Sequence, residues 1–198
     1  MITNRKEYIR YLKADEAAFK VSTAGIINTL RFQAGLFFFV EKYILLHYTK
    51  LLRKVEWLHY RKNDSLFRKF QYLYALRHYR KMSVRQQISI PLHTTGEGLC
   101  ILHLGPIIVN SGACLGRFCT LQPGVVIGQK SNSTEVPLIG NHVYFCPGAI
   151  VIGKVSIGDY AIIAPNSVVI HNVAPYDTVS GIPAKTIRKN PTATLIAI

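Results

Sequence analysis

Proline is missing from the first 90 residues, and only Gly25 and Gly35 of the 14 glycines precede Pro91. Proline and glycine break helices and mark turns, so their scarcity favours a helical first half. The sharp change in composition predicts a boundary between residues 83 and 92, where the chain changes architecture.

Several sequence signatures are also absent. The four cysteines show no CxxC spacing, which predicts neither a zinc cluster nor a disulfide framework. The most apolar stretch, AGLFFFVEKYILLHY, is broken by Glu41 and Lys42 and falls short of a bilayer span, so we expect a buried amphipathic helix there. The charged N-terminus lacks an apolar signal segment and favours a cytoplasmic location. Neither GxGxxG nor GxxxxGK[ST] occurs, which argues against hydride and phosphoryl transfer.

Acidic residues are few, and the charge is unevenly distributed. The net charge is +14; residues 1–90 hold 18 Lys/Arg and 6 Asp/Glu, and residues 91–198 hold 6 and 4. Such a surplus of positive charge is typical of proteins that bind nucleic acid, an anionic membrane surface or a polyanionic glycan. It is equally compatible with a helical face that is simply solvated. The chain has no nucleic-acid-binding motif, so we expect no nucleic-acid partner.

The first half has helical patterning. NRKEYIRYLKADEAAF follows a cap at Thr3 or Asn4, and DSLFRKFQYLYALRHYRKM begins with Asp64 or Ser65 as cap. In the second segment, one predicted stripe contains Leu66, Phe70, Leu73 and Arg77, with Leu76 alongside. Residues 24–60 are predicted to be helical, with breaks that the pattern does not place.

The second half follows a period of six. Large hydrophobic residues recur at ten of eleven positions, and turn-forming or polar residues tend to follow two places later. Such a unit is a short strand plus a turn; three units close a triangular coil, and the coils stack into a solenoid. The eleven positions are His103, Val109, Leu115, Leu121, Ile127, Ile139, Phe145, Val151, Ile157, Ile163 and Val169.

These patterns predict a mainly β protein with an N-terminal α-helical region. We assign residues 1–83 to the helical region, 84–190 to the β-helix and 191–198 to a C-terminal tail.

The segment LIGNHVYFCPGAIVIGKVSIGDYAIIAPNSVVI, followed by VSGIPAK, resembles the hexapeptide-repeat acyltransferases, which form a left-handed parallel β-helix. GLCILHLGPIIVN, LQPGVVIG and GIPAKTI are similar to serine O-acetyltransferases and their relatives among capsular-polysaccharide enzymes. The resemblance implies acetyl-CoA as donor and a homotrimer, or a dimer of trimers, with active sites shared between solenoids.

His103 stands where the six-residue period elsewhere has a large hydrophobic residue. In a strict register the ring points into the solenoid, where an unpaired imidazole is costly. Gly96, Gly98 and the Leu104-Gly105-Pro106 segment are expected to bend this first coil and turn the ring outward. The resemblance matches His103 to the catalytic histidine of the serine acetyltransferases.

Imidazole suits the implied reaction. With a reference pKa of about 6.5, histidine is largely neutral at pH 7 and accepts the proton of an attacking hydroxyl. A backbone N–H in a turn is the simplest donor to the oxyanion, and the proton then returns to the departing CoA thiolate.

The chain departs from the serine acetyltransferase pattern at several positions. Ile88 and Leu102 stand where the family has aspartates, and its later Arg-His pair aligns with Glu135 and Val136. We therefore expect a sugar hydroxyl of a surface polysaccharide or its precursor as acceptor, near the inner face of the membrane, with L-serine as the alternative. A backbone carbonyl or Glu97 is expected to orient His103.

The resemblance also implies the donor contacts. Lys185 and Arg188 are expected to meet the CoA phosphates. The pantetheine arm is expected to lie along Gly128, Pro147, Ala149, Ala164 and Pro165.

Two other classes of function remain open. One is a metal-dependent hydratase, although only His93 and His103 are near each other in the repeats, so no metal is expected. His142 and His171 are interpreted as surface residues. The other is a non-catalytic scaffold or a nucleic-acid binder that uses the basic helices.

Overall fold

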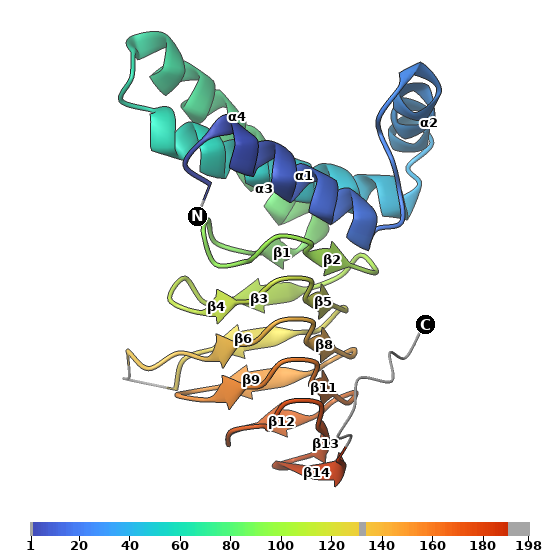
Figure 1. The fold of residues 1–198 in the computed structure, drawn as a ribbon, viewed down its shortest axis with the longest axis vertical. Helices are drawn as coiled ribbons and strands as arrows, with labels where there is room; N and C mark the ends of the chain where they lie inside the picture. The colour runs from blue at the N-terminus through green and yellow to red at the C-terminus, as the bar shows by residue number, and fades with distance from the viewer. Residues whose placement is uncertain (1, 131–133, 190–198) are drawn as a thin grey trace.

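The computed structural model describes residues 2–130 and 134–189. Its helices form a cap on one end of a column of short strands (Figure 1). The predicted tail at 191–198 lies outside the described residues. The helices of the described part are α1 (Arg5–Ala18), α2 (Ile26–Phe37), α3 (Glu41–Arg61) and α4 (Leu66–Gln86).

Side-chain caps begin two of the predicted helices. Asn4 Oδ1 accepts a hydrogen bond of 2.9 Å from the Glu7 N–H, and Ser65 Oγ accepts one of 3.2 Å from the Arg68 N–H. Each bond satisfies a donor that the helix itself leaves free. Helix α4 runs three residues past residue 83 and ends where Gln87 takes a left-handed conformation, with φ of +57°.

Two predictions about apolar packing are wrong. Leu66, Phe70 and Leu73 are exposed, because α4 packs on α3 through the face that carries Ala75 and Tyr79. The stretch AGLFFFVEKYILLHY is not one buried helix. It divides into the end of α2 and the start of α3, and the turn between them is exposed.

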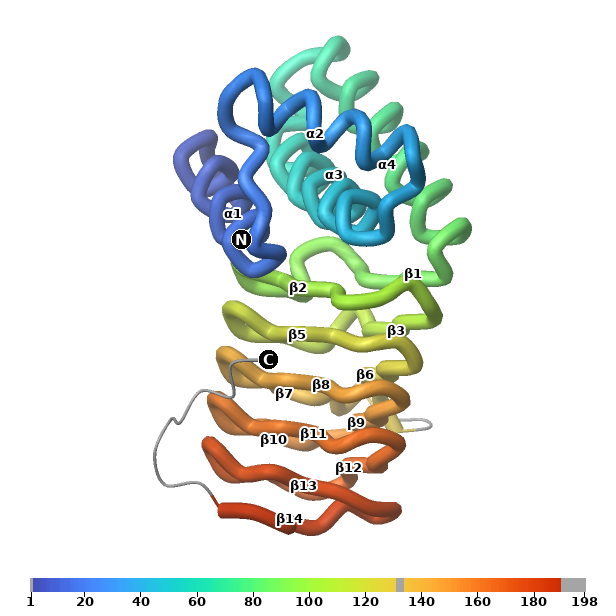
Figure 2. The backbone as a smooth tube through the Cα atoms, turned by 90° about the vertical axis from the view of Figure 1, so that its right-hand side faces the viewer, coloured from blue at the N-terminus to red at the C-terminus, as the bar shows by residue number. Residues whose placement is uncertain are grey.

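The remaining chain winds into a three-sided parallel β-helix, whose coils are stacked in Figure 2. One face has the strand order β1-β3-β6-β9-β12, another β10-β7-β4, and the third β14-β13-β11-β8-β5-β2. Only β13 and β14 pair in an antiparallel manner among these strands. The bounds are β1 Ile88–Ser89, β2 Cys100–Ile101, β3 Ile107–Val109, β4 Cys114–Leu115, β5 Thr120–Leu121, β6 Val126–Gly128, β7 Leu138–Ile139, β8 Tyr144–Phe145, β9 Ile150–Ile152, β10 Ser156–Ile157, β11 Ile162–Ile163, β12 Val168–Val169, β13 Thr178–Gly181 and β14 Ala184–Arg188.

The interior consists of three columns of buried side chains, one behind each face. Equivalent residues of successive coils are paired across the parallel strands, so each side chain stacks on the next one down the column. This is the stacking that the six-residue period predicts. The columns contain Val109, Ile127, Val151 and Val169; Leu115, Ile139 and Ile157; and Leu121, Phe145 and Ile163.

A buried ionic network joins the helical cap to the first coil. Arg53 of α3 donates from Nε to Asp15 of α1 over 2.9 Å, and from Nη1 to the Thr95 carbonyl over 3.0 Å. Asp15 Oδ1 also accepts from the N–H groups of Gly98 and Leu99, at 2.8 and 3.0 Å. The network fixes both helices directly above β2, the strand that leads to His103.

Candidate active site

The first coil has two more residues than three six-residue repeats would give. Ile101 pairs with Leu121, 20 residues later, whereas Phe145 pairs with Ile163 after 18 residues. Ile101 therefore takes the interior place that a strict register gives to His103. The extra length is accommodated next to Gly105, whose φ is +145°. His103 lies outside the strand, and its side chain is 62% exposed. The expected outward turn of the ring is confirmed.

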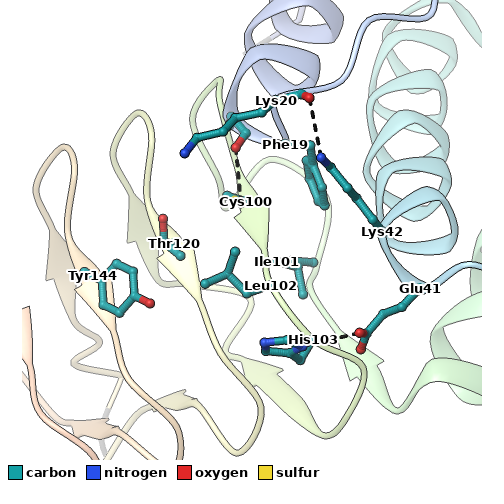
Figure 3. Close-up of a pocket in the computed structure, with 11 residues that line it drawn as sticks. Phe19, Lys20, Glu41, Lys42, Cys100, Ile101, Leu102, His103, Thr120 and Tyr144 are labelled. Carbon is teal, nitrogen blue, oxygen red and sulfur yellow. Dashed lines mark hydrogen bonds and ion pairs between the residues drawn. The ribbon is translucent and has the colours of Figure 1, made fainter. Parts of the chain in front are cut away.

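His103 lines a pocket of about 560 Å³ between the helical cap and the solenoid (Figure 3). The end of α1 and the start of α3 form one wall. The other wall is the outer surface of β2, β5 and β8. The lining residues are Ala18, Phe19, Lys20, Glu41, Lys42, Cys100, Ile101, Leu102, His103, Thr120 and Tyr144.

Glu41 is the carboxylate that contacts the imidazole. Its Oε2 lies 3.3 Å from His103 Nδ1, and its Oε1 accepts a hydrogen bond from the Leu104 N–H. A neutral ring that donates from Nδ1 keeps the lone pair of Nε2 as its base. Glu97, one of the two groups that we expected in this role, pairs instead with Arg10 at 2.7 Å.

Sequence reasoning missed Glu41 because it is 62 residues from His103 in the chain. It is the first residue of α3, where the helix dipole favours a carboxylate. Its position depends on the packing of α3, which Arg53 fixes against the first coil. The one sequence signal was an acidic residue directly after the apolar run FFFV.

Apart from the hydroxyl groups of Thr120 and Tyr144, the rest of the pocket wall is mainly apolar and has a cationic rim. Lys42 Nζ donates to the Lys20 carbonyl over 3.4 Å, so both lysines stand at the same wall. Burial raises the pKa of the Cys100 thiol to about 11, so the thiol is neutral near pH 7 and a poor nucleophile. Among the lining side chains, His103 and Glu41 are the two that can accept a proton near pH 7.

Three of the predicted donor contacts, Pro147, Ala164 and Pro165, follow β8 and β11, which belong to the same sheet as β2. Pro147 and Pro165 follow the paired residues Phe145 and Ile163 at the same offset. Ala164 precedes Pro165 at the same edge of the sheet. In the first coil the corresponding corner is taken by Pro106 rather than His103, because the Gly124 N–H donates to the Pro106 carbonyl as the Gly148 N–H donates to the Pro123 carbonyl.

The other predicted donor contacts lie elsewhere in the chain. Gly128 ends β6 on a different face, and the Ala149 side chain is fully buried in the solenoid. Lys185 and Arg188 are exposed on β14, which lies on the same sheet as β2 but at its far end. Neither cation is near His103 within one chain.

The remaining histidines are separate from the pocket. His93 is paired with His59, with 3.0 Å between His93 Nε2 and His59 Nδ1, rather than with His103. His142 stacks between Phe118 and Tyr160, at 5.1 and 4.5 Å between ring centroids. Within residues 2–130 and 134–189, no three His, Cys, Asp or Glu side chains are grouped as metal ligands.

Residues 137–171 match the family described as Bacterial transferase hexapeptide (six repeats). The chain is also 32% identical over 97 residues to a serine acetyltransferase of Synechococcus elongatus, a match that covers 48% of this chain and 40% of that protein. The chain thus spans about half of the length of the curated relatives it matches.

Solved structures agree with this match. A serine acetyltransferase of Neisseria gonorrhoeae in complex with serine superposes with a TM-score of 0.64 at 23% identity, covering 93% of this chain and 70% of that one. Residues 137–171 match the hexapeptide repeats, and the chain shares its fold with the solved serine acetyltransferases. A serine acetyltransferase in complex with CoA gives a TM-score of 0.63 at 20% identity, over 92% and 71% of the two chains. The predicted left-handed parallel β-helix is confirmed.

Proposed function

We propose that this protein is an acetyl-CoA-dependent O-acetyltransferase in which His103 is the general base and Glu41 positions its ring. The observation that carries the proposal is the pair itself. An exposed imidazole in a pocket has Nδ1 held by a carboxylate 3.3 Å away, on a fold shared with serine acetyltransferases.

The reaction follows from this arrangement. Nε2 of His103 removes the proton of the acceptor hydroxyl as its oxygen attacks the thioester carbonyl. Glu41 stabilises the positive charge that then develops on the ring. The tetrahedral intermediate collapses when the C–S bond breaks, and His103 returns the proton to the CoA thiolate. The products are the O-acetyl ester and free CoA.

The comparisons favour L-serine as acceptor over the sugar hydroxyl that we expected. The similar proteins named above are serine acetyltransferases, and one was solved with serine bound. The pocket also contains charges of both signs, since Lys20 and Lys42 line it together with Glu41. A lysine there can pair with the carboxylate of an amino acid. We therefore propose L-serine as the first acceptor.

A sugar hydroxyl remains the second candidate because of the residues that replace the family pattern. Leu102 lines the pocket where the resemblance places an aspartate, and Val136 replaces a histidine. An apolar side chain at these positions offers no partner to an amino-acid ammonium or carboxylate.

We also propose that the active site is completed in a homotrimer. Large apolar side chains are exposed on the outside of the solenoid, and a neighbouring solenoid would cover them. Gly128 lies at a corner away from His103, so it can meet the same donor only from another subunit. The exposed residues are Leu104, Ile108, Leu138 and Ile170. Light scattering should give three times the chain mass of 22.3 kDa, and a monomer with full activity would refute a shared site.

The activity is tested by the release of free CoA thiol from acetyl-CoA. L-Serine and a panel of sugars are offered to the wild type and to His103→Ala, and mass spectrometry identifies the acetylated product. We expect ester formation with L-serine that depends on His103. Ester formation on sugars alone would replace the proposed acceptor. Absence of thiol release with every acceptor, despite CoA binding, would refute the proposed activity.

A further inference from the structure

Helix α2 lies at one side of the helical cap, apart from α1 and α4 (Figure 1). It is anchored through buried Phe32 and Gly35. On its outer side and in the turn to α3, six large apolar side chains are between 62% and 82% exposed. They are Ile26, Ile27, Leu30, Phe37, Phe38 and Phe39, which we call the α2 apolar surface. An exposed group of this kind marks an interaction site.

The surroundings of this surface are cationic. No acidic residue occurs between Glu16 and Glu41, whereas Lys20 and Arg31 lie in this interval and are exposed. Lys42 follows immediately and is also exposed.

The acidic residues of the helical region do not offset these cations. Residues 1–90 hold 18 Lys/Arg against 6 Asp/Glu. Each of the six carboxylates already has a hydrogen-bond or ion-pair partner in the structure. They are Glu7, Asp15, Glu16, Glu41, Glu56 and Asp64. The surplus of positive charge therefore faces solvent.

We infer that the α2 apolar surface docks the protein on an anionic lipid membrane. Phenylalanine and leucine side chains enter the boundary between headgroups and acyl chains, while lysine and arginine pair with anionic headgroups. A second copy of this chain is a poorer occupant, because it would bring two regions of the same strong positive charge together. None of the described helices is long and apolar enough to cross a bilayer, so the contact is peripheral. The inference does not depend on the acetyl transfer proposed above.

The test is co-sedimentation of the full chain with lipid vesicles. One set is phosphatidylcholine alone, and the other contains about a third phosphatidylglycerol. We expect binding to the anionic vesicles that weakens as salt is added. The variant Phe37→Ser/Phe38→Ser/Phe39→Ser should bind at least ~tenfold more weakly, because it removes three inserting aromatic side chains.

A matched control carries Leu66→Ser/Phe67→Ser/Phe70→Ser, which removes exposed apolar side chains from α4. It should bind the vesicles within about twofold of the wild type. Equal losses for both variants, or equal binding to both lipid compositions, would overturn the inference. It would also be overturned if the wild type failed to sediment with the anionic vesicles. A smaller mass of the α2 variant by light scattering would then identify a second copy as the occupant of the surface. Circular dichroism spectra that match the wild type show that both variants fold.

Discussion

Replacing Glu41 with glutamine should slow acetyl transfer by about five- to tenfold. The change removes the charge but keeps an oxygen that can accept from the Leu104 N–H. At 3.3 Å, and with the dielectric constant of water for this exposed pair, Coulomb's law gives ~1.3 kcal/mol of attraction between the carboxylate and the imidazolium that forms during the reaction. Exposed ion pairs contribute up to about 1 kcal/mol in practice, which sets the lower figure.

Steady-state kinetics separates this effect from a structural one. The loss should appear in kcat, with the KM for acetyl-CoA within about twofold of the wild type, because Glu41 acts on the transition state through His103. Glu41→Asp, which retains the charge, should recover part of the loss, and added salt should reduce the difference between wild type and Glu41→Gln. A kcat for Glu41→Gln within about twofold of the wild type would refute the positioning role.

Three further predictions concern the structure that supports the site. Arg53→Ala leaves Asp15 buried without its cation and should lower the free energy of unfolding in urea by about 3–5 kcal/mol; a loss below about 1 kcal/mol would contradict the network. Phe145→Ala empties a fully buried place and should cost about 3–5 kcal/mol in the same assay, and a loss below about 1 kcal/mol would show that the side chain does not fill the column. Iodoacetamide should label the exposed Cys114 before Cys119, because burial raises the pKa of the Cys119 thiol to about 12. Labelling in the reverse order, detected by mass spectrometry, would contradict this prediction.

The solenoid was predictable from the sequence because each coil repeats the same local requirement. A side chain such as Leu121 or Phe145 stacks on its equivalents one coil away, so burial recurs at a fixed spacing in the chain. The caps at Asn4 and Ser65 were predictable for a related reason, since their partners lie three residues away.

The irregular first coil was only partly predictable. Gly105 and Pro106 indicated a distortion, and the outward turn of His103 followed from it. Ile101 takes the interior place because the first coil is two residues longer than the others in the 18-residue register. The six-residue pattern gives no sign of this extra length.

Features that depend on tertiary packing escaped the sequence analysis. Glu41 reaches His103 only because α3 lies across the first coil. The apolar stripe of Leu66, Phe70 and Leu73 has the period of a buried helix face, but α3 packs against another side of α4. Periodicity shows that a face is apolar, and it does not show which neighbour covers it.

The central claim is that the His103 imidazole removes the proton of the acceptor hydroxyl. The most direct test is single-turnover acetyl transfer with His103→Asn, measured by rapid quench, alongside calorimetry of CoA binding. We predict that the chemical step slows by about 10²–10⁴-fold while the CoA dissociation constant stays within about twofold of the wild type. A His103→Asn variant that transfers acetyl groups at the wild-type rate would contradict the account.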